Sequence, residues 1–162
     1  MVMTAALLVL LVLVGQLMFD GLSRLSWQFL TSFPSRFPAQ AGIVSAWVGT
    51  ILVMLVTAMA AIPLGVGAAI YLEEYAPKNW ATELIEINIA NLAGVPSIVY
   101  GLMALGLLVY QFRLGQSFLT AGLTLGMLIL PMVIIATREA ILAVPPSVRE
   151  AAYALGARKW QT

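Results

Sequence analysis

Four long stretches of this chain carry no charged side chain, and the charged residues gather between and after them. The uncharged stretches cover residues 2–19, 43–72, 89–112 and 114–137, and all four are rich in aliphatic residues. About 20 apolar residues are enough for a helix to cross a bilayer. The pattern therefore predicts an all-α, polytopic membrane helical bundle with four transmembrane helices.

The first stretch has the apolar character of either a transmembrane helix or a secretory signal peptide. No Lys or Arg precedes it, and no small-residue cleavage site follows it before Asp20. Signal peptides normally have a basic start and such a cleavage site. We therefore predict that residues 1–19 are retained as the first transmembrane helix.

Proline and glycine interrupt the later stretches. The second stretch is long, and Pro63 is the expected place of a kink. Gly94, Pro96 and Ser97 fall close together and mark the best candidate for a broken helix, while Pro131 lies inside the fourth stretch. Two interpretations stay open, because such residues help membrane helices to pack, whereas a broken helix can also line a transport pathway.

The third and fourth stretches are separated by Arg113 alone. So short a connection predicts an antiparallel helical hairpin. Gly122 and Gly126 then form a small-xxx-small pattern, which allows two helices to approach closely.

The closing segment, VPPSVREAAYALGARKWQT, predicts a short amphipathic helix. Pro145 and Pro146 end the preceding helix, and Ser147 with Glu150 has the spacing of a capping box, so we expect the new helix to begin at Ser147. Gly156 lies where a helix ends in a left-handed conformation. One face is apolar and carries Val148, Ala151, Ala152 and Leu155. About two turns of helix are not stable alone in water, so this face must rest on the membrane, on its own bundle or on another protein.

Composition excludes several classes of function. Hydrophobic residues make up 62% of the 162 residues and charged residues 9%, against about 25% charged in ordinary globular domains. A net charge of +1 argues against nucleic acid as a partner. The chain has no Cys or His, and neither lysine follows a glycine as in an ATP-binding loop. We therefore predict no enzyme, no catalytic residues, no metal site and no cofactor.

The basic residues of the loops favour a cytoplasmic N-terminus. In that orientation five basic residues lie inside and three outside: Lys78, Arg138, Arg149, Arg158 and Lys159 against Arg24, Arg36 and Arg113. Residues 20–42 would then form a periplasmic loop, and the closing segment would be cytoplasmic. Four acidic residues are expected to mark a solvated surface loop: Glu73, Glu74, Glu83 and Glu86.

The sequence EAAYALG resembles the EAA signature of ABC importer permeases. Glu150, Ala151, Ala152 and Gly156 match it, and the I-x-L-P part of the signature would lie beyond Thr162. The stretches IPLGVGAAIYLEEYAP, LAGVPSIVYGL and LILPMVIIATREAILAVPPSVREAAYALGARKWQT are similar to the inner-membrane permeases of phosphate-specific uptake systems. This similarity runs over residues 42–162. AAIYLEEYA and REAAYALGA are more similar to the PstA type than to the PstC type.

The resemblance implies a permease subunit of an ATP-driven phosphate importer in the cell inner membrane. The implied partners are a homodimeric ABC ATPase, a paralogous permease subunit as heterodimer partner, a periplasmic phosphate-binding protein, phosphate and the lipid bilayer. Residues 43–162 would be part of the permease core, and residues 145–162 the EAA coupling segment. The implied ATPase-coupling residues are Val148, Glu150, Ala151, Ala152, Leu155, Gly156, Arg158 and Lys159. The family pattern has six helices, so we expect these 162 residues alone to form no complete pathway.

Several alternatives stay open. A permease for phosphonate, sulfate or molybdate would share the coupling helix, and a non-transporting structural or regulatory membrane protein would rest that helix on lipid. Glu150 would also serve the capping box without an ATPase, and Lys159 and Trp160 would suit the membrane interface. Arg138, beside Glu139, is expected to be an interfacial arginine, with an oxyanion ligand as the alternative. The pathway or hinge candidates are Pro63, Gly94, Pro96, Ser97, Pro131 and Arg138.

Overall fold

The computed structural model describes residues 2–159 and residue 161, so the expected interfacial role of Trp160 lies outside the described residues. Within them the chain forms helices and loops and no strand. The all-α, polytopic prediction is confirmed. The chain divides into two compact units, Met1–Ile51 and Leu52–Thr162, which are described separately.

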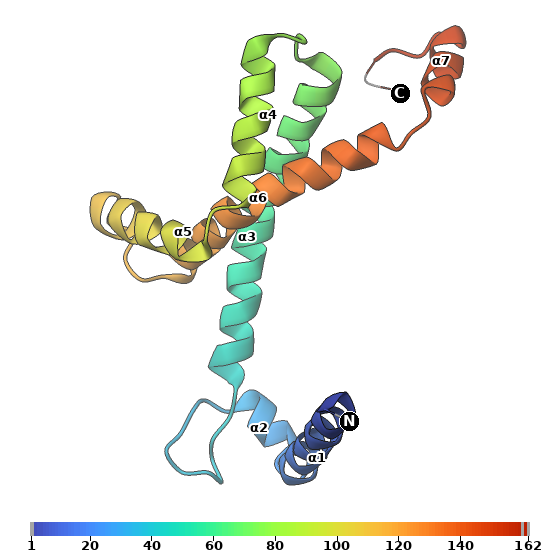
Figure 1. Cartoon of the computed structure of the whole chain (residues 1–162). Helices are drawn as coiled ribbons and strands as arrows, with labels where there is room; N and C mark the ends of the chain where they lie inside the picture. Colours follow the sequence, from blue (N-terminus) through green and yellow to red (C-terminus); the bar gives the residue numbers. More distant parts are fainter. Residues whose placement is uncertain (1, 160, 162) are drawn as a thin grey trace. The chain divides into compact units, whose positions relative to one another are not determined.

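The first unit contains α1 (Val2–Leu22), α2 (Trp27–Thr31) and the start of α3 (Val44–Ile70) (Figure 1). None of the α1 residues is buried, as expected of a helix whose surroundings are lipid. Ser26 caps α2 by accepting a hydrogen bond from the Phe29 amide at 3.2 Å. The Trp47 indole of α3 donates to the Leu30 carbonyl at 3.0 Å. The predicted loop 20–42 thus contains a short helix and is tied to the beginning of α3.

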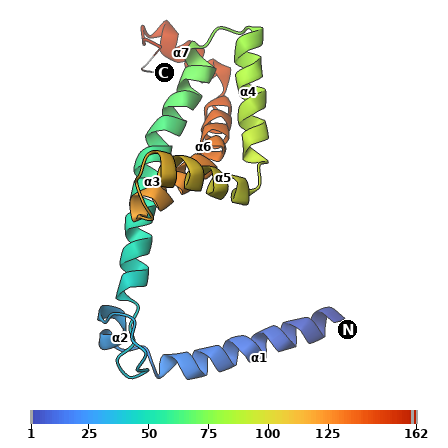
Figure 2. The ribbon, with the colours of Figure 1, turned by 90° about the vertical axis from the view of Figure 1, so that its left-hand side faces the viewer.

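The second unit contains the rest of α3 and six further elements. These are the π-helix η1 (Tyr71–Tyr75), α4 (Trp80–Ala93), α5 (Ser97–Ala104), the π-helix η2 (Leu105–Gln111), α6 (Phe118–Leu142) and α7 (Pro146–Ala154). Figures 1 and 2 show the chain turning back after η1, so that α4 runs in the opposite direction to the end of α3 and meets α6. A small apolar core joins these elements, with Ala69, Leu72 and Ile134 buried and Ile89 of α4 packed against them.

Helices α3 and α6 pack closely at Gly122. The Thr57 hydroxyl of α3 is buried and donates to the Gly122 carbonyl of α6 at 3.0 Å. A Cβ atom at Gly122 would lie 2.6 Å from the Val56 Cβ, whereas one at Gly126 would lie 3.6 Å from the Ala60 Cβ. The small-xxx-small pattern therefore serves helix packing, as predicted.

Three described helical segments are long and apolar enough to span a membrane: Val2–Leu22, Val44–Tyr75 and Phe118–Leu142. A fourth span exists only if Trp80–Ala93 and Ser97–Gln111, which meet at a 97° bend, are counted together. The predicted third stretch, residues 89–112, is thus divided between the end of α4, α5 and η2. Pro96 has no amide hydrogen and disfavours a helical conformation at Val95, so the helix breaks at the predicted place.

The other predicted boundaries shift by a few residues. Helix α3 continues through Pro63, and α-helical hydrogen bonding gives way to π-helical bonding only at η1. Helix α6 begins at Phe118 rather than Leu114, because Ser117 caps it by accepting from the Thr120 amide. Arg113, with φ of 54°, lies in the turn before this cap, where the chain reverses direction (Figure 1).

Candidate functional site

The closing helix α7 begins one residue earlier than predicted. Pro145 is its N-cap, Pro146 is the first helical residue, and no side chain caps the helix. The predicted capping box of Ser147 and Glu150 was therefore wrong. Proline is favoured at the first helical position because its fixed φ suits a helix and the amide hydrogen that it lacks would have no helical partner there.

The predicted end of this helix is confirmed. Gly156 has a φ of +85°, in the left-handed region that glycine adopts without steric cost. The Gly156 amide donates to the Tyr153 carbonyl at 2.9 Å, and the Ala157 amide donates to the Ala152 carbonyl at 3.1 Å. These two hydrogen bonds form a Schellman motif, which ends α7 sharply.

The apolar face of α7 is open. Val148 is 56% exposed and Leu155 is 90% exposed. Ala151 is also exposed, and Ala152 is half-buried at the edge of the face. The apolar face was expected to rest on the membrane, on the chain's own bundle or on another protein. The bundle does not cover Val148 and Leu155, so the membrane and another protein stay as the possible supports.

A different side of α7 fixes it to the second unit. The Arg149 guanidinium forms an ion pair with Glu74 of η1, and its Nη2 donates to the Ile141 carbonyl at the end of α6 at 2.9 Å. Just after α7, the Lys159 ammonium donates to the Glu74 carbonyl and lies 5.2 Å from the centre of the Tyr75 ring. The coupling-segment candidates Val148 and Leu155 thus point away from the chain, while Lys159 points back to it.

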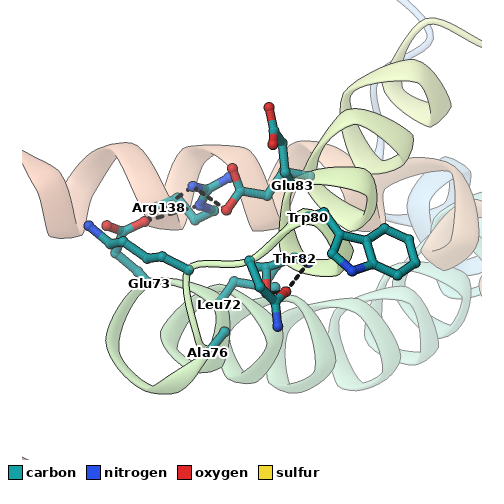
Figure 3. A pocket seen from close by; sticks show the side chains of 10 residues that line it. Leu72, Glu73, Ala76, Trp80, Thr82, Glu83 and Arg138 are labelled. Atoms are coloured by element: carbon teal, nitrogen blue, oxygen red, sulfur yellow. Dashed lines mark hydrogen bonds and ion pairs between the residues drawn. The ribbon is translucent and has the colours of Figure 1, made fainter.

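Arg138 of α6 joins two further elements (Figure 3). Its Nη2 lies 3.2 Å from a carboxylate oxygen of Glu73 in η1 and 3.1 Å from one of Glu86 in α4. The three side chains are between 16% and 34% exposed and line a cavity of about 500 Å³ together with Glu83 and Asn79. The site therefore combines two cationic side chains, Arg138 and Lys78, with carboxylates from η1 and α4.

The prediction that the acidic residues mark a loop was wrong. Glu73 and Glu74 belong to η1, and Glu83 and Glu86 belong to α4, so these residues are helical. Arg138 is half-buried and paired with two of these carboxylates, and its place at the membrane interface stays a prediction. The physical reason is that the end of α3 and the start of α4 bring acidic side chains to α6, where an ion pair competes with snorkelling.

The remaining pathway candidates lie on separate elements. Gly94 ends α4, Pro96 precedes α5, and Pro131 is buried inside α6. At the break, the Leu92 carbonyl accepts hydrogen bonds from the Val95 amide at 3.1 Å and from the Tyr100 hydroxyl at 3.0 Å.

Tyr100 is only 6% exposed and was missed by the sequence reasoning. The signal in the sequence was a tyrosine four residues after Pro96, the proline that breaks the helix. Because its hydroxyl gives the Leu92 carbonyl a further hydrogen bond across the break, Tyr100 stabilises the bend.

Comparisons with known proteins identify the family of this chain. The family model described as "Binding-protein-dependent transport system inner membrane component" matches residues 61–162. The chain is 34% identical to the probable ABC transporter permease protein YqgI of Bacillus subtilis, over 95% of this chain and 52% of that protein. It is 39% identical to the phosphate transport system permease protein PstA 1 of Mycobacterium tuberculosis strain H37Rv, over 80% of this chain and 41% of the relative.

The PstC permease of the phosphate transport system of Haemophilus influenzae is 30% identical, over 99% of this chain and 58% of that protein. The chain thus spans about half the length of the curated relatives that it matches. No solved structure matches it.

Proposed function

Because the chain belongs to the family of binding-protein-dependent transport system inner membrane components, we propose that it works as a permease subunit of an ATP-driven phosphate importer. Its own residues bind no nucleotide, and a separate ATPase supplies the energy through α7. A multi-pass protein of the inner membrane, it forms part of the translocation pathway together with a paralogous permease subunit. A periplasmic binding protein delivers the phosphate.

The observation that carries the coupling role is the open apolar face of α7. Leu155 is 90% exposed and Val148 56% exposed, although α7 is fixed to the rest of the unit through Arg149. Exposed apolar side chains on a helix that is fixed in place are typical of a surface that binds a partner. The groove of an ATPase subunit, as the EAA resemblance implies, is the partner that we propose.

The ion pairs also support the proposed orientation. Glu74 follows α3, Arg149 lies in α7, and their contact requires both to lie on the same side of the membrane. Lys78 and Arg138 line the cavity that contains Glu73, the neighbour of Glu74. A cytoplasmic position for this end of the unit agrees with the excess of basic residues expected there.

Crosslinking to the ATPase tests the proposed coupling. The chain has no cysteine, so single cysteines can be placed at Val148, Ala151 and Leu155 in membranes that contain the ATPase of the same system. Crosslinks are expected at all three positions. Tyr153 is the control, because at 100° per residue it lies on another face of α7. Labelling of the apolar positions by lipid-phase probes, without a crosslink to the ATPase, would instead place α7 on the membrane.

Competition between solutes tests the choice of phosphate. In the complete transporter that contains this chain, uptake of radioactive phosphate is measured with an excess of sulfate, molybdate or a phosphonate. Phosphate carries a proton at neutral pH that sulfate lacks, so sulfate is expected to compete at least about 100-fold less well. Equal competition by one of these oxyanions would assign the transporter to that solute. The basis of the phosphate proposal is that the relatives PstA 1 and PstC are named as parts of phosphate transport systems.

A further inference from the structure

Arg149 and Glu74 connect the closing helix to two other helices of the second unit. We propose that they are positioning residues, which hold α7 in the orientation that leaves Val148 and Leu155 open to a partner. The inference rests on the proposed function insofar as the partner is an ATPase. The orientation of α7 can be measured without that partner.

Arg149 makes contacts that fix a direction. One nitrogen of its guanidinium pairs with the Glu74 carboxylate, and another donates to the Ile141 carbonyl at 2.9 Å. The Ile141 carbonyl, in the last turn of α6, also accepts from the Val144 amide at 3.3 Å, and a cation is favourable at this end of a helix. The Arg149 and Glu74 side chains are only 28% and 19% exposed, so water screens this pair less than it screens a surface ion pair. The planar guanidinium therefore sets both the position and the angle of the first turn of α7.

A second attachment follows α7. After the Schellman motif turns the chain at Gly156, the Lys159 ammonium reaches the Glu74 carbonyl and the face of the Tyr75 ring. Glu74 therefore holds the segment through its side chain on one end of α7 and through its backbone on the other. Rotation of α7 about its own axis would break at least one of these contacts.

The π-helix η1 directs the side chains of its two consecutive glutamates, Glu73 and Glu74, to different helices. Glu73 binds Arg138 of α6, whereas Glu74 binds Arg149 of α7. Its i to i+5 bonding continues to the Ala76 amide, which donates to the Tyr71 carbonyl at 2.8 Å. Short π-helical segments occur mostly as local insertions in α-helices and often at functional sites. The Glu73 contact keeps η1 against α6, so Glu74 offers Arg149 a fixed support.

Reactivity of single cysteines measures the orientation directly. In membranes without ATPase, the chain with Leu155→Cys is compared with the chain with Ala152→Cys, using a water-soluble maleimide. Leu155 is 90% exposed and Ala152 is half-buried, so we expect roughly tenfold faster labelling at position 155. Arg149→Glu removes both contacts and places a carboxylate beside Glu74. The ratio of labelling rates is then expected to fall to about 2 or less, because charged hydrogen bonds of this kind are worth about tenfold in an equilibrium.

Rescue separates positioning from a general loss of stability. Glu74→Arg combined with Arg149→Glu restores an opposite-charge pair, and the ratio is expected to return to at least half of its native value. Arg149→Lys keeps the charge without the planar fork and should give an intermediate ratio. Arg113→Glu is the matched control: it makes the same arginine-to-glutamate change at an exposed site of the second unit, before α6, and should leave the ratio unchanged.

The outcomes distinguish this inference from the proposed function. If Arg149→Glu leaves the labelling ratio at its native value, or if the charge swap fails to restore it, the positioning role is wrong, whatever the crosslinking shows. If the ratio falls and is restored by the swap, the positioning role holds. In that case, failure of the native α7 to crosslink to the ATPase would overturn only the proposed coupling.

Discussion

Replacing Gly122 with alanine is expected to destabilise the second unit, whereas the same change at Gly126 is not. The added Cβ at Gly122 would lie 2.6 Å from the Val56 Cβ and 3.0 Å from the Val53 carbonyl oxygen of α3. Because a backbone atom cannot turn aside as a flexible side chain can, the two helices must separate. Overpacking of this kind costs about 1–3 kcal/mol. Separation also weakens the buried hydrogen bond from Thr57 to the Gly122 carbonyl, which is worth about 1 kcal/mol.

Gly126 provides a matched control within the same helix. A Cβ there would lie 3.6 Å from the Ala60 Cβ, an ordinary van der Waals contact. The higher helix propensity of alanine is then unopposed, and stability should stay the same or rise by up to about 1 kcal/mol. Unfolding of both variants in mixed detergent micelles, followed by circular dichroism, measures the difference. Equal stability of the two variants would show that α3 and α6 do not pack at Gly122.

Arg138→Ala should be the second most damaging single change. It leaves the Glu73 and Glu86 carboxylates close together with their shared cation removed. Hydrogen bonds to charged groups contribute about 1.5–3 kcal/mol when buried, and partial exposure of these side chains reduces this range. We therefore expect a loss of about 1–2 kcal/mol in the free energy of unfolding.

Two further variants separate the ion pair from the rest of the arginine side chain. Glu86→Gln should cost less than Arg138→Ala, because Glu73 still pairs with Arg138. Combining Arg138→Ala with Glu73→Gln should restore part of the lost stability, since the double variant buries fewer unpaired charges. A double-mutant cycle on urea or detergent unfolding gives the coupling energy. Strictly additive effects would mean that these ion pairs do not form in the membrane.

The features that were predictable from the sequence are those determined by neighbouring residues. Aliphatic stretches predicted the membrane helices, the Gly94–Pro96 cluster predicted the broken helix, and Gly156 predicted the left-handed end of α7. Each of these depends on backbone chemistry within a few positions. At the start of α7 two local signals competed, and Pro146 at the first helical position prevailed over a capping box at Ser147.

The features that were not predictable join distant parts of the chain. Arg138 and Glu73 are 65 residues apart, and Arg149 and Glu74 are 75 apart. One sequence offers each arginine several acidic residues, and only the packing of α3, α4 and α6 selects the partner. The Tyr100 hydroxyl was missed for a related reason, because its partner at Leu92 comes within reach only after the chain bends by 97°.

The use of two consecutive residues, Glu73 and Glu74, for two different partners restricts how this part of the chain can change in length. Insertion or deletion of one residue in η1 would rotate the following side chains about the helix axis by the angle between successive residues. No single shift could then return one carboxylate to α6 and the other to α7. We therefore expect insertions and deletions to be tolerated far better in the loop between Ser32 and Gly42 than between Leu72 and Ala76. Between Leu72 and Ala76 the number of residues decides which partner each carboxylate meets.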